Sequence, residues 1–116
     1  MPTRVLIVDD DSGFRAIART LLHGNGYAVV AEAADGAEAL TTADRLDLDV
    51  ALVDVQLPDT DGVSLARRLA DHDAGLRIVL TSTDPALVTP AALAESGAVA
   101  FVPKQELATT DLARWL

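Results

Sequence analysis

The segment VLIVDDDSG, residues 5–13, runs four apolar residues directly into three consecutive aspartates, Asp9, Asp10 and Asp11. A short, β-branched apolar run is typical of a strand that is covered on both faces of a sheet. Like charges at the end of such a strand repel one another and are costly to remove from water. The segment therefore predicts a buried strand whose end carries a chemistry that needs carboxylates.

Four more apolar runs of the same kind follow along the chain: AVVAEA at 28–33, DVALVDV at 49–55, RIVLTS at 77–82 and AVAFVPK at 98–104. The first three connections have apolar residues at helical spacing, at 14–24, 36–46 and 62–72. Strands that alternate with helices predict an α/β fold, here a doubly wound parallel sheet of five strands with right-handed crossovers. We expect the strand order 2-1-3-4-5, with ligands bound outside the carboxyl ends of the strands.

The helical segments differ in how clearly they can be interpreted. In 14–24 we expect Phe14, Ile17 and Leu21 to form the buried stripe, with the helix ending at Gly24. In the fourth connection Pro85 and Pro90 exclude one continuous helix. We expect a loop there and then a short helix that has Thr89 as its N-cap and Pro90 at its first position. The final QELATTDLARWL, residues 105–116, predicts a last helix.

Length and composition limit the function. The 116 residues fit one domain, 1–116, and there is no cysteine. No apolar run is long enough to span a bilayer and none resembles a signal peptide, so we expect a soluble cytoplasmic protein without membrane contact. A net charge of -9 argues against direct binding of nucleic acid and favours a cation or a basic partner. Eight of the nine basic residues are Arg, and the single Lys is Lys104.

Polar residues end four of the five predicted strands: Asp9 and Asp10, Asp54, Thr81 and Ser82, and Lys104. If the first and third strands are neighbours, Asp9, Asp10 and Asp54 converge on one site. Three carboxylates so close require a cation or a raised pKa, and oxygen ligands without His or Cys favour Mg²⁺. We interpret Asp11 as a solvated helix-start residue beside Ser12.

A carboxylate beside bound Mg²⁺ can also act as a nucleophile toward phosphorus. Phosphoryl transfer needs positive charge and hydrogen-bond donors around the phosphoryl oxygens. Asp54 is central in the predicted order, Lys104 can supply the charge, and the Thr81 hydroxyl can donate a hydrogen bond. These residues predict phosphoryl transfer at Asp54.

Over essentially its whole length the sequence resembles the receiver domain of bacterial two-component response regulators. The matching segments are IVDDD at 7–11, DVQLPDTDG at 54–62, VLTS at 79–82 and GAVAFVPK at 97–104. The resemblance implies a flavodoxin-like (βα)5 fold and a phosphorylation-dependent signalling switch rather than a turnover enzyme. KQEL, residues 104–107, makes the chain most similar to receivers of LuxR/NarL-type regulators. A stand-alone receiver and the receiver of a longer regulator both fit the sequence.

The resemblance also implies a role for individual positions. Asp54 would accept the phosphoryl group from a histidine kinase or a phosphotransfer protein, with Lys104 pairing with its oxygens. Asp10 would ligate Mg²⁺ directly and Asp9 through water, and the backbone carbonyl of Gln56 would complete the set of ligands that the protein supplies.

The remaining positions implied by the resemblance concern switching and lifetime. Thr81 and Phe101 would be the switch residues, while Gln56, Ser82 and Thr83 would tune access of water to the phosphoryl group. The output face would be the fourth helix, the fifth strand and the last helix. Receivers commonly pair through this face, and both a monomer and a homodimer fit the sequence. The proline-interrupted fourth connection departs from the family pattern in that face.

Two other functions compete with the switch. A degenerate receiver acting as a constitutive interaction module is favoured by Ser82, where the family usually has Ala or Gly, and by the altered fourth helix. A Mg²⁺-dependent phosphatase with a phospho-aspartate intermediate shares the chemistry, but its usual second Asp, two residues after the nucleophile, is Gln56 here.

Overall fold

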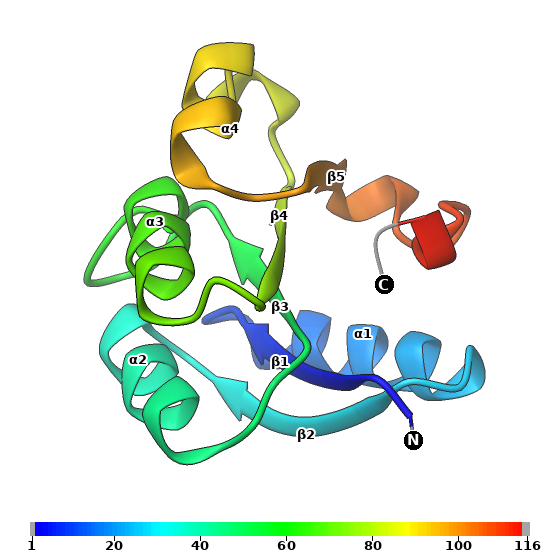
Figure 1. The fold of residues 1–116 in the computed structure, drawn as a ribbon. Helices are drawn as coiled ribbons and strands as arrows, with labels where there is room; N and C mark the ends of the chain where they lie inside the picture. Colours follow the sequence, from blue (N-terminus) through cyan, green and yellow to red (C-terminus); the bar gives the residue numbers. More distant parts are fainter. Residues whose placement is uncertain (1, 115–116) are drawn as a thin grey trace.

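The computed structural model describes residues 2–114 as a parallel sheet flanked by helices on both faces (Figure 1). The strands are β1 (Arg4–Val8), β2 (Ala28–Ala33), β3 (Val50–Asp54), β4 (Arg77–Ser82) and β5 (Ala100–Pro103). The helices are α1 (Ser12–Gly24), α2 (Gly36–Arg45), α3 (Gly62–His72) and α4 (Pro90–Ser96), with short 3-10 turns at Pro85–Leu87, Lys104–Glu106 and Leu112–Arg114. The strand order is β2-β1-β3-β4-β5 and every pairing is parallel, which confirms the predicted doubly wound sheet.

Alternation along each strand divides the core between two faces. In β1, Leu6 and Val8 belong to the core cluster that includes residues of α2 and α3, whereas Val5 and Ile7 belong to the cluster that includes residues of α1 and of the segment after β5. All five residues of β3 are buried, as expected for the central strand of a sheet that is covered on both faces.

Polar side chains start the four helices. Asp11, Asp35, Asp61 and Thr89 each accept a hydrogen bond from a backbone N–H of the first turn. Such caps satisfy donors that have no partner within the helix. Asp11 is exposed, as interpreted from the sequence, and Thr89 with Pro90 begins α4 after a loop, so both of these predictions are confirmed.

The predicted buried stripe of α1 is wrong in one position. Ile17 is 67% exposed, and the side chains that are buried are Ala18 and Leu22. The stripe follows Phe14, Ala18 and Leu22 at a spacing of four, and the small Ala18 allows α1 to lie close to the sheet.

The predicted last helix is also wrong in the part that the structure describes, so the (βα)5 pattern lacks its fifth helix there. Two 3-10 turns, Lys104–Glu106 and Leu112–Arg114, replace it. The hydroxyls of Thr109 and Thr110 both donate to the Glu106 carbonyl, and the Asp111 carboxylate accepts from the backbone N–H of Ala113. These side chains compete with the helical hydrogen bonds of the backbone. Residues 115 and 116 of the predicted helix lie outside the described residues.

Between residues 2 and 114, no helix has both the length and the apolar character that crossing a membrane would need.

Candidate functional site

Three carboxylates meet at the carboxyl edge of the sheet. Asp9 follows β1 and Asp54 ends β3, and since β1 and β3 are neighbours, the two residues lie side by side. Asp9 is 1% and Asp54 6% exposed, while Asp10 is exposed to solvent. One carboxylate oxygen from each of the three lies within 4.8 Å of the others. The convergence predicted from the strand order is therefore observed.

Lys104 brings the positive charge to these carboxylates. It follows β5, and its Nζ lies 2.7 Å from Asp9 Oδ2 and 3.5 Å from Asp54 Oδ2. The same Nζ lies 4.4 Å from the centroid of the Phe14 ring. The ammonium is thus enclosed by two carboxylates and an aromatic face, with the Lys104 side chain 13% exposed.

Burial and charge set the protonation of this cluster. Burial raises the pKa of the Asp54 carboxyl and the neighbouring Asp9 charge raises it further, and the attraction of Lys104 does not fully offset them. Burial alone would lower the pKa of Lys104, but its ion pairs with Asp9 and Asp54 outweigh burial and raise it. Ionised Asp54 is therefore under-compensated and favours the approach of a second cation.

The donor set fits a hard divalent cation. Carboxylate oxygens dominate it, and a solvent-facing Asp10 leaves room for the waters that Mg²⁺ retains. Gln56 follows Asp54 in the same loop, and its backbone N–H donates to Asp54 Oδ1 at 3.3 Å.

The loop after β3 turns tightly. The N–H of Gly62 donates to the Val55 carbonyl at 2.6 Å, and Gln56 and Asp61 form an isolated antiparallel β-bridge. A Cβ at Gly62 would lie 2.2 Å from the Asp54 carbonyl oxygen, a distance that no side chain tolerates. Glycine is required here because the start of α3 packs against the backbone of the site.

Thr81 on β4 is the direct sheet neighbour of Asp54. Its Oγ1 is buried and has no hydrogen-bond partner among the described residues. A buried hydroxyl without a partner is costly, so it marks a place where a further polar group can be accepted. Ser82 is buried and its Oγ accepts from the Asp84 N–H, whereas Thr83 is exposed.

Phe101 lies one strand further out, on β5, paired with Leu80. It is half-buried and packs against the core cluster beneath α2, α3 and α4. Its ring therefore joins the edge strand to the core, and its role as a switch residue stays a prediction.

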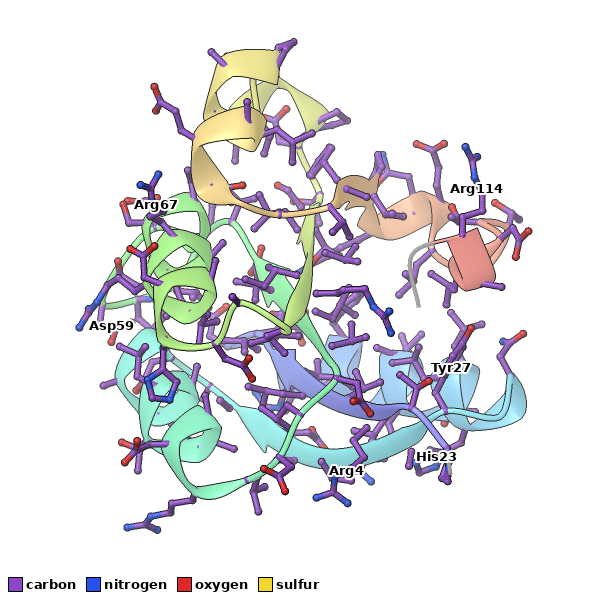
Figure 2. The ribbon with its side chains drawn as sticks, viewed as in Figure 1. Arg4, His23, Tyr27, Asp59, Arg67 and Arg114 are labelled. Carbon is purple, nitrogen blue, oxygen red and sulfur yellow. The ribbon has the colours of Figure 1, made fainter. Side chains whose placement is uncertain are left out.

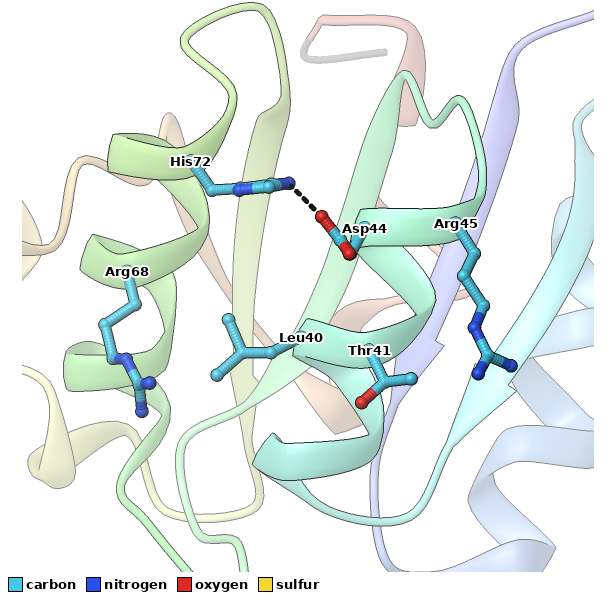
Figure 3. A pocket seen from close by; sticks show the side chains of 6 residues that line it. All are labelled: Leu40, Thr41, Asp44, Arg45, Arg68 and His72. Atoms are coloured by element: carbon cyan, nitrogen blue, oxygen red, sulfur yellow. Dashed lines mark ion pairs between the residues drawn. The ribbon is translucent and has the colours of Figure 1, made fainter.

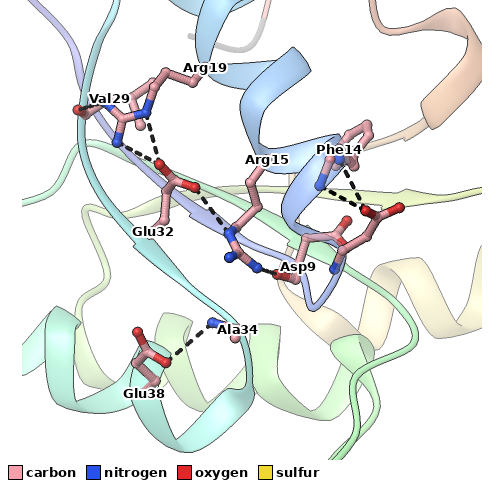
Figure 4. Close-up of polar contacts among 10 residues, drawn as sticks. Asp9, Phe14, Arg15, Arg19, Val29, Glu32, Ala34 and Glu38 are labelled. Atoms are coloured by element: carbon pink, nitrogen blue, oxygen red, sulfur yellow. Dashed lines mark hydrogen bonds and ion pairs between the residues drawn. The ribbon is translucent and has the colours of Figure 1, made fainter.

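Two polar residues beside the site were missed in the sequence. The carboxylate of Asp59 accepts from the N–H groups of Gly36, at 2.8 Å, and Ala37, at 3.0 Å, and these hydrogen bonds lower its pKa. It thereby joins the loop after β3 to the start of α2 (Figure 2). Arg15 donates to the backbone carbonyl of Asp9 and pairs with Glu32 at 3.0 Å (Figure 4).

A groove lies between α2 and α3, away from the carboxylates (Figure 3). This groove of about 530 Å³ is lined by Leu40, Thr41, Asp44, Arg45, Arg68 and His72. His72 Nε2 lies 3.8 Å from Asp44 Oδ1. The groove lies along the carboxyl-terminal halves of the two helices, which run back toward the amino ends of the strands, and so it is separate from the carboxylate site.

Comparison with known proteins agrees with this geometry. Residues 5–114 match the family model described as "Response regulator receiver domain". The chain is 39% identical over 105 residues to response regulator MprA of Mycobacterium sp. (strain KMS), covering 90% of this chain and 45% of that protein. It is 35% identical over 82 residues to the chemotaxis protein CheY of Bacillus subtilis, covering 71% of this chain and 68% of that protein.

Among solved structures, a LuxR-family two-component response regulator from Aurantimonas sp. SI85-9A1 superimposes with a TM-score of 0.86 and 30% identity, covering 98% of this chain and 81% of the other. The chain spans half or less of the length of several curated relatives that it matches. A family match over nearly all of the chain, the shared fold and the acidic site at the strand ends place this chain in the response regulator receiver family.

Proposed function

We propose that this chain is a phosphorylation-dependent signalling switch in which Asp54 accepts a phosphoryl group from a histidine kinase or a phosphotransfer protein. One observation carries the proposal. The buried carboxylate of Asp54 lies 3.5 Å from the Lys104 ammonium, and its direct sheet neighbour is Thr81, whose hydroxyl has no hydrogen-bond partner among the described residues. These are the charge and the donor that the oxygens of a phosphoryl group need.

Asp9, Asp10 and Asp54, with the Gln56 backbone carbonyl, would hold Mg²⁺. When bound, the ion supplies positive charge that offsets the carboxylates and the phosphoryl oxygens.

Asp54 acts as the nucleophile in the proposed transfer. A carboxylate oxygen of Asp54 forms a bond to phosphorus while the P–N bond of the donor phosphohistidine breaks, and the electron pair stays on the imidazole nitrogen. Lys104 moves from Asp9 toward the new phosphoryl oxygens, and the Thr81 hydroxyl donates a hydrogen bond to one of them. The group then remains on Asp54 until water hydrolyses it, so the chain is a phosphoacceptor that assists its own phosphorylation and dephosphorylation rather than a turnover enzyme.

The output surface consists of α4, β5 and the turns that follow β5, because the described residues form no fifth helix. Converting a mostly inactive population to a mostly active one requires about 5.5 kcal/mol of differential stabilisation. A phosphoryl group of about -1.5 to -2 charge, held by Lys104 and Thr81, is a suitable source. Phe101 belongs to β5 in this surface, packs against the core and lies on the strand next to β4, which carries Thr81, so it is placed to change with Thr81.

The test is a comparison of amide spectra before and after addition of beryllofluoride, a phosphoryl mimic, with Mg²⁺. The switch predicts shifted signals not only around Asp54 but also at Thr81, Phe101 and α4. The competing function, a degenerate receiver that acts as a constitutive interaction module, predicts an unchanged spectrum beyond the immediate site. An unchanged spectrum would reject the switch in favour of that module.

A further inference from the structure

The ring of Phe14 encloses the side of Lys104 that the carboxylates leave open. Lys104 Nζ lies 4.4 Å from the ring centroid, 2.7 Å from Asp9 Oδ2 and 3.5 Å from Asp54 Oδ2. The negative face of an aromatic ring attracts an ammonium ion within about 6 Å, most strongly when water is excluded. With its side chain only 13% exposed, Lys104 meets that condition.

Phe14 itself is held in place by a backbone hydrogen bond and by the packing of its ring. Its backbone N–H donates to Asp11 Oδ1, the N-cap of α1, at 3.3 Å, and Figure 4 shows it in the first turn of α1 near Asp9. Its ring is half-buried and packs against the core cluster that includes Val5 and Ile7. A ring fixed in this way offers a stationary surface to a flexible side chain.

Lysine otherwise has a strongly hydrated head on four rotatable bonds, and ordering it costs conformational entropy. With Asp9 as its nearest partner at 2.7 Å, the ammonium would be open to competition from water once that ion pair loosened. The ring, 4.4 Å from Nζ, offers the ammonium a further attractive contact near Asp9 and Asp54.

We propose that Phe14 is a positioning residue for phosphoryl transfer, whose ring face keeps the Lys104 ammonium beside Asp54 while the ammonium exchanges Asp9 for the phosphoryl oxygens. This inference rests on the proposed function, since it assigns a task within that reaction. The aromatic character of Phe14 is the feature that matters, rather than its bulk.

The contact can be measured directly, because Lys104 is the only lysine in the chain. Protein made with ¹³C-labelled lysine gives a single ε-methylene signal, recorded without metal or phosphodonor. A ring 4.4 Å away shifts the ε-proton resonance upfield from its free-lysine position, and Phe14→Leu removes that shift. An unshifted native signal, or an equal shift in Phe14→Leu, would overturn the inference.

The role is measured by the rate of phosphoryl uptake from acetyl phosphate with Mg²⁺, followed by intact mass. Phe14→Leu slows uptake about two- to tenfold, since a cation–π contact of this kind has that effect on a rate. Phe14→Tyr keeps the ring and restores a near-native rate. Equal rates for Phe14→Leu and the native protein, or no recovery in Phe14→Tyr, would overturn the role.

Tyr27→Leu is the matched control. Tyr27 is also half-buried and packs against the same core cluster, but the aromatic ring that Lys104 contacts is that of Phe14. Its loss of an aromatic ring leaves the uptake rate unchanged, and a fall equal to that of Phe14→Leu would mean that packing alone explains the effect. If the native protein takes up no phosphoryl group, the proposed function fails and so does the role of Phe14 in it. If the native protein takes up the phosphoryl group but Phe14→Leu and Tyr27→Leu have equal uptake rates, the positioning role of Phe14 fails and the proposed function stands.

Discussion

Asp54 carries a carboxylate that the fold makes costly to ionise. It is 6% exposed and Asp9 lies beside it, and the attraction of Lys104 with the hydrogen bond from the Gln56 N–H does not fully offset these two effects. A buried carboxylate whose negative charge is only partly offset by neighbouring groups is typical of sites that bind a cation or carry out a reaction. The cost has a measurable sign, because burial and Asp9 raise the pKa of Asp54 in the folded protein.

Asp54→Asn is expected to stabilise the metal-free protein. A raised folded-state pKa means that ionisation destabilises the fold at every pH above that pKa, and that the penalty disappears below the ordinary value of 3.8. The variant should gain on the order of 1 kcal/mol in free energy of unfolding at pH 7 and lose that gain in acid. Urea unfolding in EDTA at several pH values measures this, and a less stable variant at pH 7 would contradict it.

Glu32 should show the opposite pH dependence. The hydrogen bond from Arg19 is the main cause of its lowered pKa, with Arg15 adding to it (Figure 4). Its contribution is therefore present above 4.5 and lost as the pH falls through the lowered folded-state pKa. Glu32→Gln should destabilise by no more than about 1 kcal/mol at pH 7, with the difference shrinking in acid in the same urea experiment. A difference that grows in acid would be inconsistent with the ion pairs.

At the scale of elements, close backbone approaches constrain the loop between β3 and α3. It must leave Asp54, return within a few residues and start α3 against the backbone of the site. Gly62 permits that approach, and Asp59 ties the loop to α2 through Gly36 and Ala37.

Two glycine substitutions separate this steric requirement from ordinary helix propensity. Gly62→Ala would place a Cβ 2.2 Å from the Asp54 carbonyl oxygen and should cost about 3 kcal/mol or more of stability. Gly24→Ala, at the end of α1 with nothing within 4 Å, should be neutral or stabilising by up to about 1 kcal/mol. Thermal unfolding of both variants gives the comparison, and similar melting temperatures would refute the steric account.

The sequence predicted the five strands, three long helices and the capped α4, because period, caps and prolines are local signals. It did not predict the loss of the last helix, where the side chains of Thr109, Thr110 and Asp111 compete with the backbone. It also misplaced Ile17, since a one-residue rotation of a stripe depends on how closely the helix approaches the sheet.

At the scale of the whole molecule, the strand order assembles the site. Asp9 and Lys104 lie at opposite ends of the chain, yet parallel strands bring them within 2.7 Å. The carboxylates could be predicted because each ends a strand. Asp59, Arg15 and the Phe14 ring could not, since their partners are set by tertiary packing and leave no local pattern.

A net charge of -9 with an acidic cluster at one edge predicts stabilisation by Mg²⁺. Millimolar Mg²⁺ should raise the melting temperature of the native protein and do so much less for Asp10→Asn. Asp11→Asn is the control, since it removes one negative charge at the position next to Asp10, and Asn also serves as an N-cap. Equal responses in the two variants would show a general charge effect instead of a site.

The central claim is phosphoryl transfer to Asp54, and the most direct measurement is the intact mass of the protein after incubation with acetyl phosphate and Mg²⁺, with Asp54→Asn run alongside. The account predicts one added phosphoryl group on the native chain and none on the variant. A native chain that gains no mass, or a variant that gains the same mass, would contradict it.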